Sequence, residues 1–272
     1  MNAKEFRLRR FLGEGEKLVV AAMDHGAFHG PIPGLVDPRQ ACMQLKAADA
    51  VLMAPGMISH VADILAEPDG PWLITRLVWN STYCFQWKHF QSHHRPMLSV
   101  AQAMAAGADI VLASLAINTG SEQTDAENAS LFSRCVQQAA ELGVPIIGEY
   151  YPAGTEHMTP DQLHENIRIG CRVAVELGAD IIKTFYTGPR FAEVAAGTPA
   201  PILVLGAEKT PTERDALALA ARAAEGGARG IVFGRNIFQS RNPAGFIQAL
   251  RAIMGGKSTI DAALKAYDLE KA

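Results

Sequence analysis

The 272-residue sequence lacks the features that mark several protein classes. Its four cysteines lie far apart and form no CxxC pair, so we expect them to be reduced, mostly buried small residues. Charged residues make up 19%, the net charge is −3 and no dense Lys/Arg run occurs, which argues against a nucleic-acid-binding surface. No window approaches the roughly 18 apolar residues of a membrane span, and the first residues do not resemble a signal peptide. We therefore expect a cytoplasmic protein without nucleic-acid or membrane partners.

Two nucleotide-binding motifs are also missing. Neither GxGxxG nor GxxxxGK[ST] occurs, so the classical dinucleotide-binding and P-loop folds lack support. Apolar residues, in contrast, make up 49% of the chain, which is enough for a sizeable core. The length permits two domains of ordinary size or a single large α/β barrel.

Eight short apolar runs recur along the chain at a mean spacing of about 30 residues, which suits a strand, a helix and their connections. The runs begin at Leu18, Ala50, Trp72, Asp109, Val144, Asp180, Pro201 and Gly230. Four of the stretches between them are rich in Ala, Leu and Glu and end in a glycine just before the next run. A glycine at that point is typical of a helix C-terminus, where the backbone needs a positive φ.

The runs are almost continuously apolar and do not alternate with polar residues, which indicates strands buried on both faces of a parallel sheet. Eight such strand–helix units without a Ser/Gly/Pro-rich linker predict one α/β domain over residues 1–272, a single (β/α)8 TIM barrel. Residues 257–272 are predicted to form a C-terminal helix. An open doubly wound sheet is the alternative.

In an α/β barrel the chemistry gathers at the C-terminal ends of the strands. Lys183 closes the sixth run, DIIKT, and is therefore expected in the barrel mouth. Burial and neighbouring cations favour the neutral form of an amine, which attacks carbonyls and forms a Schiff base. The alternative is a lysine held in a salt bridge by a barrel carboxylate such as Asp24.

Asp24 ends the first run and could hold that amine or cap the following loop, His-Gly-Ala-Phe-His-Gly. Tyr151 follows the fifth run and could move the proton of a substrate hydroxyl, although a Tyr-Tyr-Pro sequence is also typical of packing.

The loops after the last two runs predict a phosphate site. They contain glycines and cations close to a following helix, in GAEKT (Gly206, Ala207, Lys209) and in GIVFGRN (Gly234, Arg235). In this barrel these two loops commonly bind phosphate through backbone amides at a helix N-terminus.

Histidines and aromatic residues give weaker predictions. His25 and His29 have the spacing of metal ligands on a helix, but neighbouring Gly and Pro residues favour a loop. The adjacent pair His93–His94 is expected at the surface. Four aromatic residues after the third run have helical spacing and predict a buried helix face: Trp79, Tyr83, Trp87 and Phe90.

Taken together, four segments resemble the archaeal-type class I fructose-bisphosphate aldolase family, within the deoxyribose-phosphate/fructose-bisphosphate aldolase superfamily. The segments are DHGAFHGP, YYPAG, DIIKTFYTG and GARGIVFGRNIFQ, and they occur in the family's order. The similarity extends from about Phe11 to Gly255.

The resemblance implies a Schiff-base lysine at Lys183, with Asp24 beside it and Tyr151 as the acid/base. His29 matches the second histidine of the first motif. Phosphate would be bound by Gly206, Ala207, Gly234 and Arg235, with Lys209 near. The family also implies a reaction without a metal or other cofactor, a small sugar-phosphate substrate and a homo-oligomer.

Two residues depart from the family pattern. Glu149 stands where tryptophan is common, and Ala153 where arginine is common. Glu149 is therefore a candidate substrate-binding residue, and the substrate stays open between fructose 1,6-bisphosphate and a related sugar phosphate. A thiolase- or transaldolase-like transfer on a phosphorylated dicarbonyl, a metal-dependent enzyme using His25 and His29, and a catalytically silent sugar-phosphate-binding barrel are the alternatives.

Overall fold

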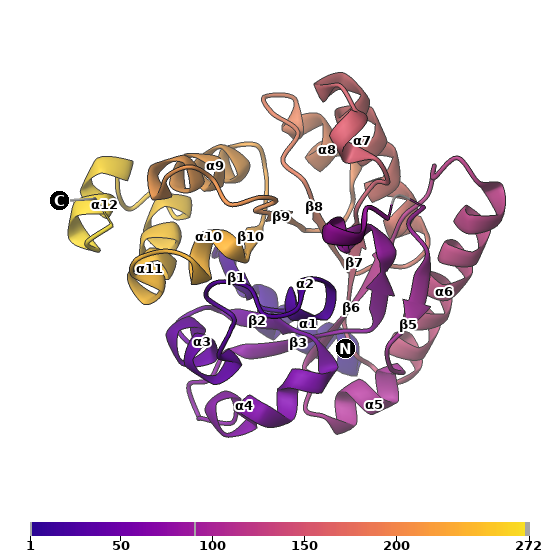
Figure 1. The fold of residues 1–272 in the computed structure, drawn as a ribbon, viewed down its shortest axis with the longest axis horizontal. Helices are drawn as coiled ribbons and strands as arrows, with labels where there is room; N and C mark the ends of the chain where they lie inside the picture. The colour runs from indigo at the N-terminus through magenta and orange to yellow at the C-terminus, as the bar shows by residue number, and fades with distance from the viewer. Residues whose placement is uncertain (1, 90, 270–272) are drawn as a thin grey trace.

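The centre of the molecule is a closed barrel of eight parallel strands, seen in a computed structural model that describes residues 2–89 and 91–269. Each strand pairs with its neighbours in chain order, and the last pairs with the first (Figure 1). The strands are β1 (Leu18–Ala22), β2 (Ala50–Met53), β3 (Trp72–Arg76), β6 (Ile110–Leu115), β7 (Ile146–Tyr150), β8 (Ile181–Thr184), β9 (Ile202–Leu205) and β10 (Gly230–Phe233). All eight apolar runs form barrel strands, and the predicted TIM barrel is confirmed.

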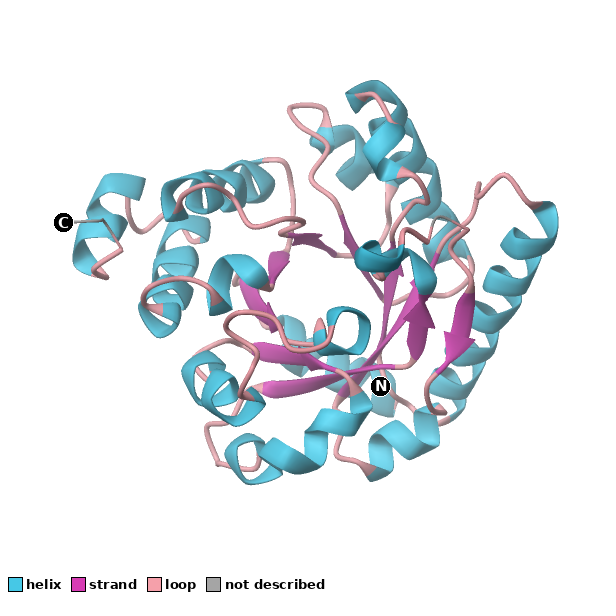
Figure 2. Cartoon of the chain, in the orientation of Figure 1, coloured by secondary structure: helices cyan, strands magenta, loops and turns pink. Residues whose placement is uncertain are grey.

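Helices surround the barrel on its outer face (Figure 2). The α-helices are α1 (Ala3–Leu12), α2 (Gly26–His29), α3 (Pro38–Leu45), α4 (Ile58–Leu65), α5 (Val100–Ala105), α6 (Glu122–Glu141), α7 (Pro160–Glu176), α8 (Phe191–Gly197), α9 (Glu213–Glu225), α10 (Arg235–Phe238), α11 (Pro243–Met254) and α12 (Ile260–Ala266). Short 3₁₀ helices are η1 (Pro55–Met57), η2 (Ser81–Tyr83), η3 (Phe85–Trp87) and η4 (Thr155–His157). No helix in the described ranges is long and apolar enough to cross a bilayer.

The helix stops predicted from glycine occur as expected. Gly107, Gly143, Gly178 and Gly227 follow α5, α6, α7 and α9, and their φ angles are +100°, +64°, +106° and +99°. A residue with a Cβ rarely adopts this left-handed conformation, so glycine ends each helix and turns the chain toward the next strand.

Alternate residues of each strand belong to two separate cores. In β1, Leu18, Val20 and Ala22 pack inside the barrel, whereas Val19 and Ala21 pack against the surrounding helices. Because side chains alternate across a strand, the residue two positions after an inward-facing one also faces the barrel axis.

Helix α1 closes the N-terminal end of the barrel, and Figure 1 shows it behind the strands. Phe11 of this helix joins the inner core and makes an edge-to-face contact with Trp72, with ring centroids 5.5 Å apart. Apolar side chains therefore fill the barrel from this end up to the layer below the opposite mouth.

The aromatic helix predicted after the third strand does not form. Instead, β4 (Val78–Asn80) pairs with β5 (His94–Pro96) in an antiparallel hairpin that also contains η2 and η3. Lys88 and Ser92 have φ of +53° and +51°, which an α-helix cannot contain.

The four aromatic residues consequently share no helix face. Tyr83 is buried, whereas the side chain of Trp87 is 60% exposed. Phe90 lies outside the described residues. The pairing of β4 with β5, which residues 81–93 connect, takes precedence over the local helical spacing.

One close packing contact allows a direct test of the fold. The ring of Tyr150 lies against Gly170 of α7, where an added Cβ would come within 1.9 Å of Tyr150 Cζ. We expect Gly170→Ala to lower the free energy of unfolding by about 1 to 3 kcal/mol, because the buried ring must move.

Gly197 is the matched control, because no heavy atom lies within 4 Å of its added Cβ. Gly197→Ala should be neutral or stabilising by up to about 1 kcal/mol. Urea unfolding measures both variants, and equal stabilities would contradict the contact.

Candidate active site

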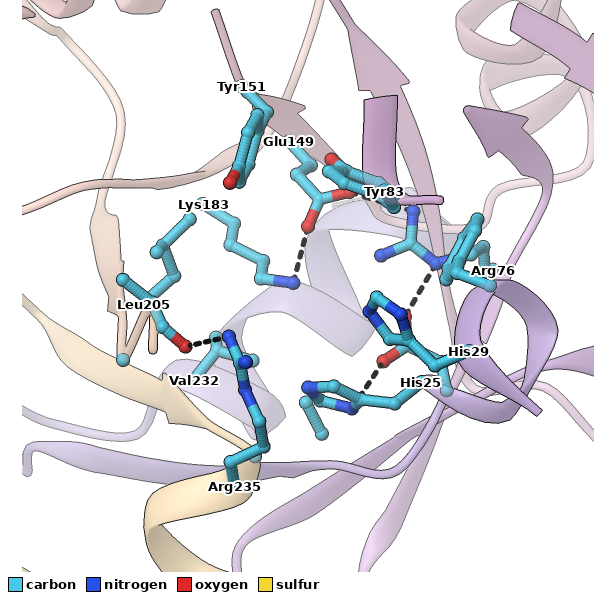
Figure 3. A pocket seen from close by; sticks show the side chains of 16 residues that line it. His25, His29, Arg76, Tyr83, Glu149, Tyr151, Lys183, Leu205, Val232 and Arg235 are labelled. Atoms are coloured by element: carbon cyan, nitrogen blue, oxygen red, sulfur yellow. Dashed lines mark hydrogen bonds and ion pairs between the residues drawn. The ribbon is translucent and has the colours of Figure 1, made fainter. Parts of the chain in front are cut away.

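A pocket opens at the C-terminal mouth of the barrel, and Figure 3 shows it from close by. Nine of the ten predicted site residues line it, from five different strands or the loops that follow them. These are Asp24, His29, Glu149, Tyr151, Lys183, Gly206, Ala207, Gly234 and Arg235. The tenth, Lys209, is exposed, does not line the pocket and donates a hydrogen bond to the carbonyl of Gln239.

The polar floor of the pocket follows from the strand alternation. Glu149 and Lys183 come two residues after Ile147 and Ile181, which fill the barrel interior. They are also register partners on adjacent strands. Asp24, Arg76 and Ser114 stand in the same relation to Ala22, Ile74 and Leu112. The polar residues thus form the layer directly above the apolar core.

Arg76 lies at the centre of this layer and is 2% exposed. Its Nε donates to Asp24 Oδ2 at 2.5 Å, and its Nη1 donates to Glu149 Oε2 at 2.7 Å and to Ser114 Oγ at 2.9 Å. Its guanidinium carbon also lies 5.3 Å from the ring centroids of Phe28 and Tyr83. Arg76 is therefore satisfied by its protein neighbours.

Lys183 donates a hydrogen bond from Nζ to Glu149 Oε1 and is 6% exposed. The two interpretations of the sequence are thus combined, since the lysine lies in the mouth and is also ion-paired. Asp24, proposed as its salt-bridge partner, is instead bonded to Arg76. Lys183 pairs with Glu149 and not with Asp24 because Glu149 is its register partner in the sheet, whereas Asp24 follows a more distant strand.

The four ionised groups balance one another in charge, with two carboxylates and two cations. Burial opposes ionisation of Glu149, but Arg76 and Lys183 hold its pKa well below the usual range. The pKa of Asp24 is likewise lowered, since Arg76 and Lys183 outweigh the effect of burial. Both carboxylates are therefore anionic at neutral pH, and the pair of cations is needed to keep them buried.

Aromatic residues form one wall of the pocket. Tyr83 makes edge-to-face contacts with Phe28 and Tyr151, each at a centroid separation of 4.9 Å. Burial raises the pKa of Tyr151 to about 12, so its phenol is protonated at neutral pH. Figure 3 shows the Tyr151 hydroxyl on the side of the pocket where Lys183 lies. The phenol can therefore donate a proton or hydrogen bond to a group bound at the lysine.

The opposite wall comes from the loops after β9 and β10. Arg235 Nη2 donates to the carbonyl of Ala207 at 2.8 Å, and Ala207 has a φ of +49°. Gly234 lies so close to His25 that an added Cβ would come within 2.2 Å of its Cε1. The wall thus joins the two loops predicted to bind phosphate.

His25 and His29 lie on a short turn of helix beside this wall, with ring centroids 6.4 Å apart. Burial lowers the pKa of His25 to about 4, so the ring is neutral at pH 7. Within residues 2–89 and 91–269, no group of three or more His, Cys, Asp or Glu side chains could hold a metal ion. The metal-dependent alternative therefore finds no third ligand among these residues.

His94, expected at the surface, is 2% exposed. It is the β5 partner of Asn80 in the hairpin, and its amide donates to the side chain of the buried Asn128. Burial lowers its pKa to about 3. The hairpin turns this histidine inward, which adjacency in sequence does not reveal.

Arg76, Ser114 and Tyr83 are functional candidates that the sequence interpretation missed. A signal for the first two was present, since each lies two residues after an inward apolar residue of its run. Tyr83 had no such signal, because the hairpin places it by contacts with Phe28 and Tyr151.

Comparisons with known proteins place this chain among aldolases. The model of the DeoC/LacD family aldolase matches residues 18–240. An uncharacterized aldolase of Saccharolobus solfataricus is 32% identical, covering 97% of this chain and 99% of its own. A 3-hydroxy-5-phosphonooxypentane-2,4-dione thiolase of Yersinia enterocolitica is 29% identical, with 97% and 86% coverage.

A solved structure extends the similarity to three dimensions. It is an archaeal fructose-1,6-bisphosphate aldolase whose catalytic lysine is covalently bound to the carbinolamine intermediate of the substrate. It is 25% identical to this chain, with a TM-score of 0.79, and the match covers 93% of this chain and 99% of that one.

The buried charges make Arg76 critical for stability. Arg76→Met should lower the free energy of unfolding by about 3 to 5 kcal/mol at pH 7, because two buried carboxylates lose their shared cation. The exposed pair Arg39–Asp63 provides a control, with side chains 50% and 64% exposed. Arg39→Met should change the stability far less than Arg76→Met, because solvent screens an exposed ion pair. Chemical denaturation compares the two, and similar losses would refute a special role for Arg76.

The buried His94 should make the stability of the fold sensitive to acid. Its folded-state pKa of about 3 lies below the ordinary value of 6.5, so below pH 6.5 the unfolded chain binds the proton and the native chain does not. The stability from this group is complete above pH 6.5 and decreases as the pH falls. Between pH 7 and pH 4.5, His94→Leu should therefore lose at least about 1 kcal/mol less stability than the wild type. The exposed His60→Leu should follow the wild type in the same denaturation series.

Proposed function

This chain belongs to the DeoC/LacD aldolase family, and we propose that it is a class I aldolase acting on a phosphorylated ketose through a Schiff base on Lys183. The observation that carries the proposal is the buried Lys183 amine, held by Glu149 in the pocket that Tyr151 also lines. The related archaeal aldolase with a lysine-bound intermediate supports the same chemistry.

Schiff-base formation begins with the ammonium of Lys183. Its proton passes to Glu149, its hydrogen-bond partner, and the freed amine attacks the ketone carbon of the substrate. Arg76 lowers the proton affinity of Glu149, so the transfer is unfavourable until the N–C bond forms. The former carbonyl oxygen takes one proton from the attacking nitrogen and one from Tyr151 and leaves as water, which gives an iminium and a phenolate.

Cleavage uses that phenolate. It removes the proton of the hydroxyl on the far carbon of the breaking bond, the electrons of that bond pass to the iminium, and an aldehyde and an enamine result. Glu149 returns its proton to the enamine carbon, and water hydrolyses the iminium to a dihydroxyacetone-phosphate-like product and the Lys183 ammonium. In this scheme every group ends in its starting protonation state.

The walls suggest where the substrate binds. The phosphate lies at Arg235 and the loops containing Gly206, Ala207 and Gly234, while His29 and Asp24 border the donor half. Arg235 Nε is buried and has no hydrogen-bond partner among the described residues, which supports an anion at this position. Glu149 is saturated by Lys183, Arg76 and Ser114 and acts on the lysine more than on distal substrate groups.

A transfer reaction is the second candidate, favoured by the similarity to the Yersinia thiolase. It would keep the lysine intermediate and pass a fragment of a phosphorylated dicarbonyl to an added thiol. Product formation that depends on coenzyme A would identify it.

The lysine can be tested by trapping. Incubation with dihydroxyacetone phosphate and borohydride should give a stable amine adduct at Lys183, measured by peptide mass, and Lys183→Met should abolish both adduct and turnover. Tyr151→Phe should still form the adduct but lose about 100- to 10,000-fold in cleavage rate. Turnover in folded Lys183→Met would disprove the proposal, and binding without adduct or turnover would favour a silent sugar-phosphate-binding barrel.

A further inference from the structure

Two of the three cationic side chains that line the pocket are already ion-paired with buried carboxylates. Lys183 is paired with Glu149, and Arg76 with Asp24, Glu149 and the Ser114 hydroxyl. Neither side chain can bind a substrate anion unless a buried carboxylate loses its ion-pair partner. That loss is costly in a site with so little access to water.

Arg235 is the third cation and is differently placed. It donates one hydrogen bond to a backbone carbonyl, and its buried Nε has no partner among the described residues. Within that part of the chain no carboxylate lies within ion-pair distance of its guanidinium. Its charge is available to one phosphate.

The histidines beside Arg235 do not add positive charge at neutral pH. The pKa of His25 is lowered to about 4 and that of His29 is also lowered, in both cases chiefly by burial. The cationic capacity of this wall is therefore that of a single guanidinium.

The wall on the other side of Lys183 is aromatic. In the view of Figure 3, Arg235 and Tyr83 lie on opposite sides of the Lys183 amine. Phe28, Tyr83 and Tyr151 line this side. The carboxylates of Asp24 and Glu149, which also line the pocket, are paired with Arg76. The Tyr83 hydroxyl is buried near Glu149 and Ser114, and it has no hydrogen-bond partner among the described residues.

We infer that the pocket takes a ketose with a single phosphate, on the donor half bound by Arg235, and an uncharged hydroxylated aldehyde half bound against Tyr83. A second phosphate on the aldehyde half would lie beside aromatic rings and two carboxylates without a free cation in the lining. A hydroxyl there instead meets the unused hydroxyl of Tyr83. This inference rests on the proposed Schiff-base function.

Cleavage of three ketose phosphates tests the charge argument. The value of kcat/KM for fructose 1-phosphate should exceed that for fructose 1,6-bisphosphate and for fructose 6-phosphate by at least about tenfold. Equal or faster cleavage of the bisphosphate would overturn the inference. The dihydroxyacetone phosphate adduct distinguishes failure of this inference from failure of the proposed function. If the adduct forms but the bisphosphate is preferred, only the single-phosphate inference is refuted. If no adduct forms, the proposed function itself is refuted.

Synthesis from dihydroxyacetone phosphate tests Tyr83. The wild type should prefer glyceraldehyde to propanal, and Tyr83→Phe should reduce that preference by about tenfold, through a higher KM for glyceraldehyde. The readout is the ratio of kcat/KM for glyceraldehyde to kcat/KM for propanal, because propanal has no hydroxyl for Tyr83 to bind. If the variant slows both aldehydes equally, Tyr83 only supports the fold of the pocket and its role in recognition is refuted.

Discussion

The buried guanidinium of Arg76 is the interaction on which the rest of the site depends. Two carboxylates and a lysine can share a nearly water-free layer of the barrel only because this group bonds to both carboxylates at once. Its contacts with aromatic faces also place the pocket wall. In the proposed scheme Glu149 becomes neutral and Tyr151 becomes a phenolate while the lysine ammonium becomes an iminium, so the net charge around Arg76 would persist through the covalent step.

The sequence predicted the framework because the framework depends on local patterns. Apolar runs, helices ending in glycine and regular spacing suffice to give the barrel, and a lysine at a strand end suffices to place it in the mouth. The partners of that lysine could not be predicted in the same way. Glu149 meets Lys183 because of the register between β7 and β8, and register depends on the closed sheet as a whole.

The hairpin after the third strand shows a different limit. Aromatic residues at helical spacing predicted a helix, but β4 and β5 pair across a long segment and left-handed backbone at Lys88 prevents helical continuation. Tyr83 and His94 reach the interior only through this pairing. Site residues that lie in such an inserted hairpin are therefore the hardest to predict from the sequence, since their position depends on contacts that no local pattern encodes.

Helix α1 has a consequence for water. Among the residues that the structure describes, Phe11 and the apolar layers close the barrel from behind, so Lys183 is reached by solvent from the mouth. Substrate and water then enter the site through the same opening. A bound sugar would block this opening. The enamine would therefore contact bulk water only after the aldehyde product has left.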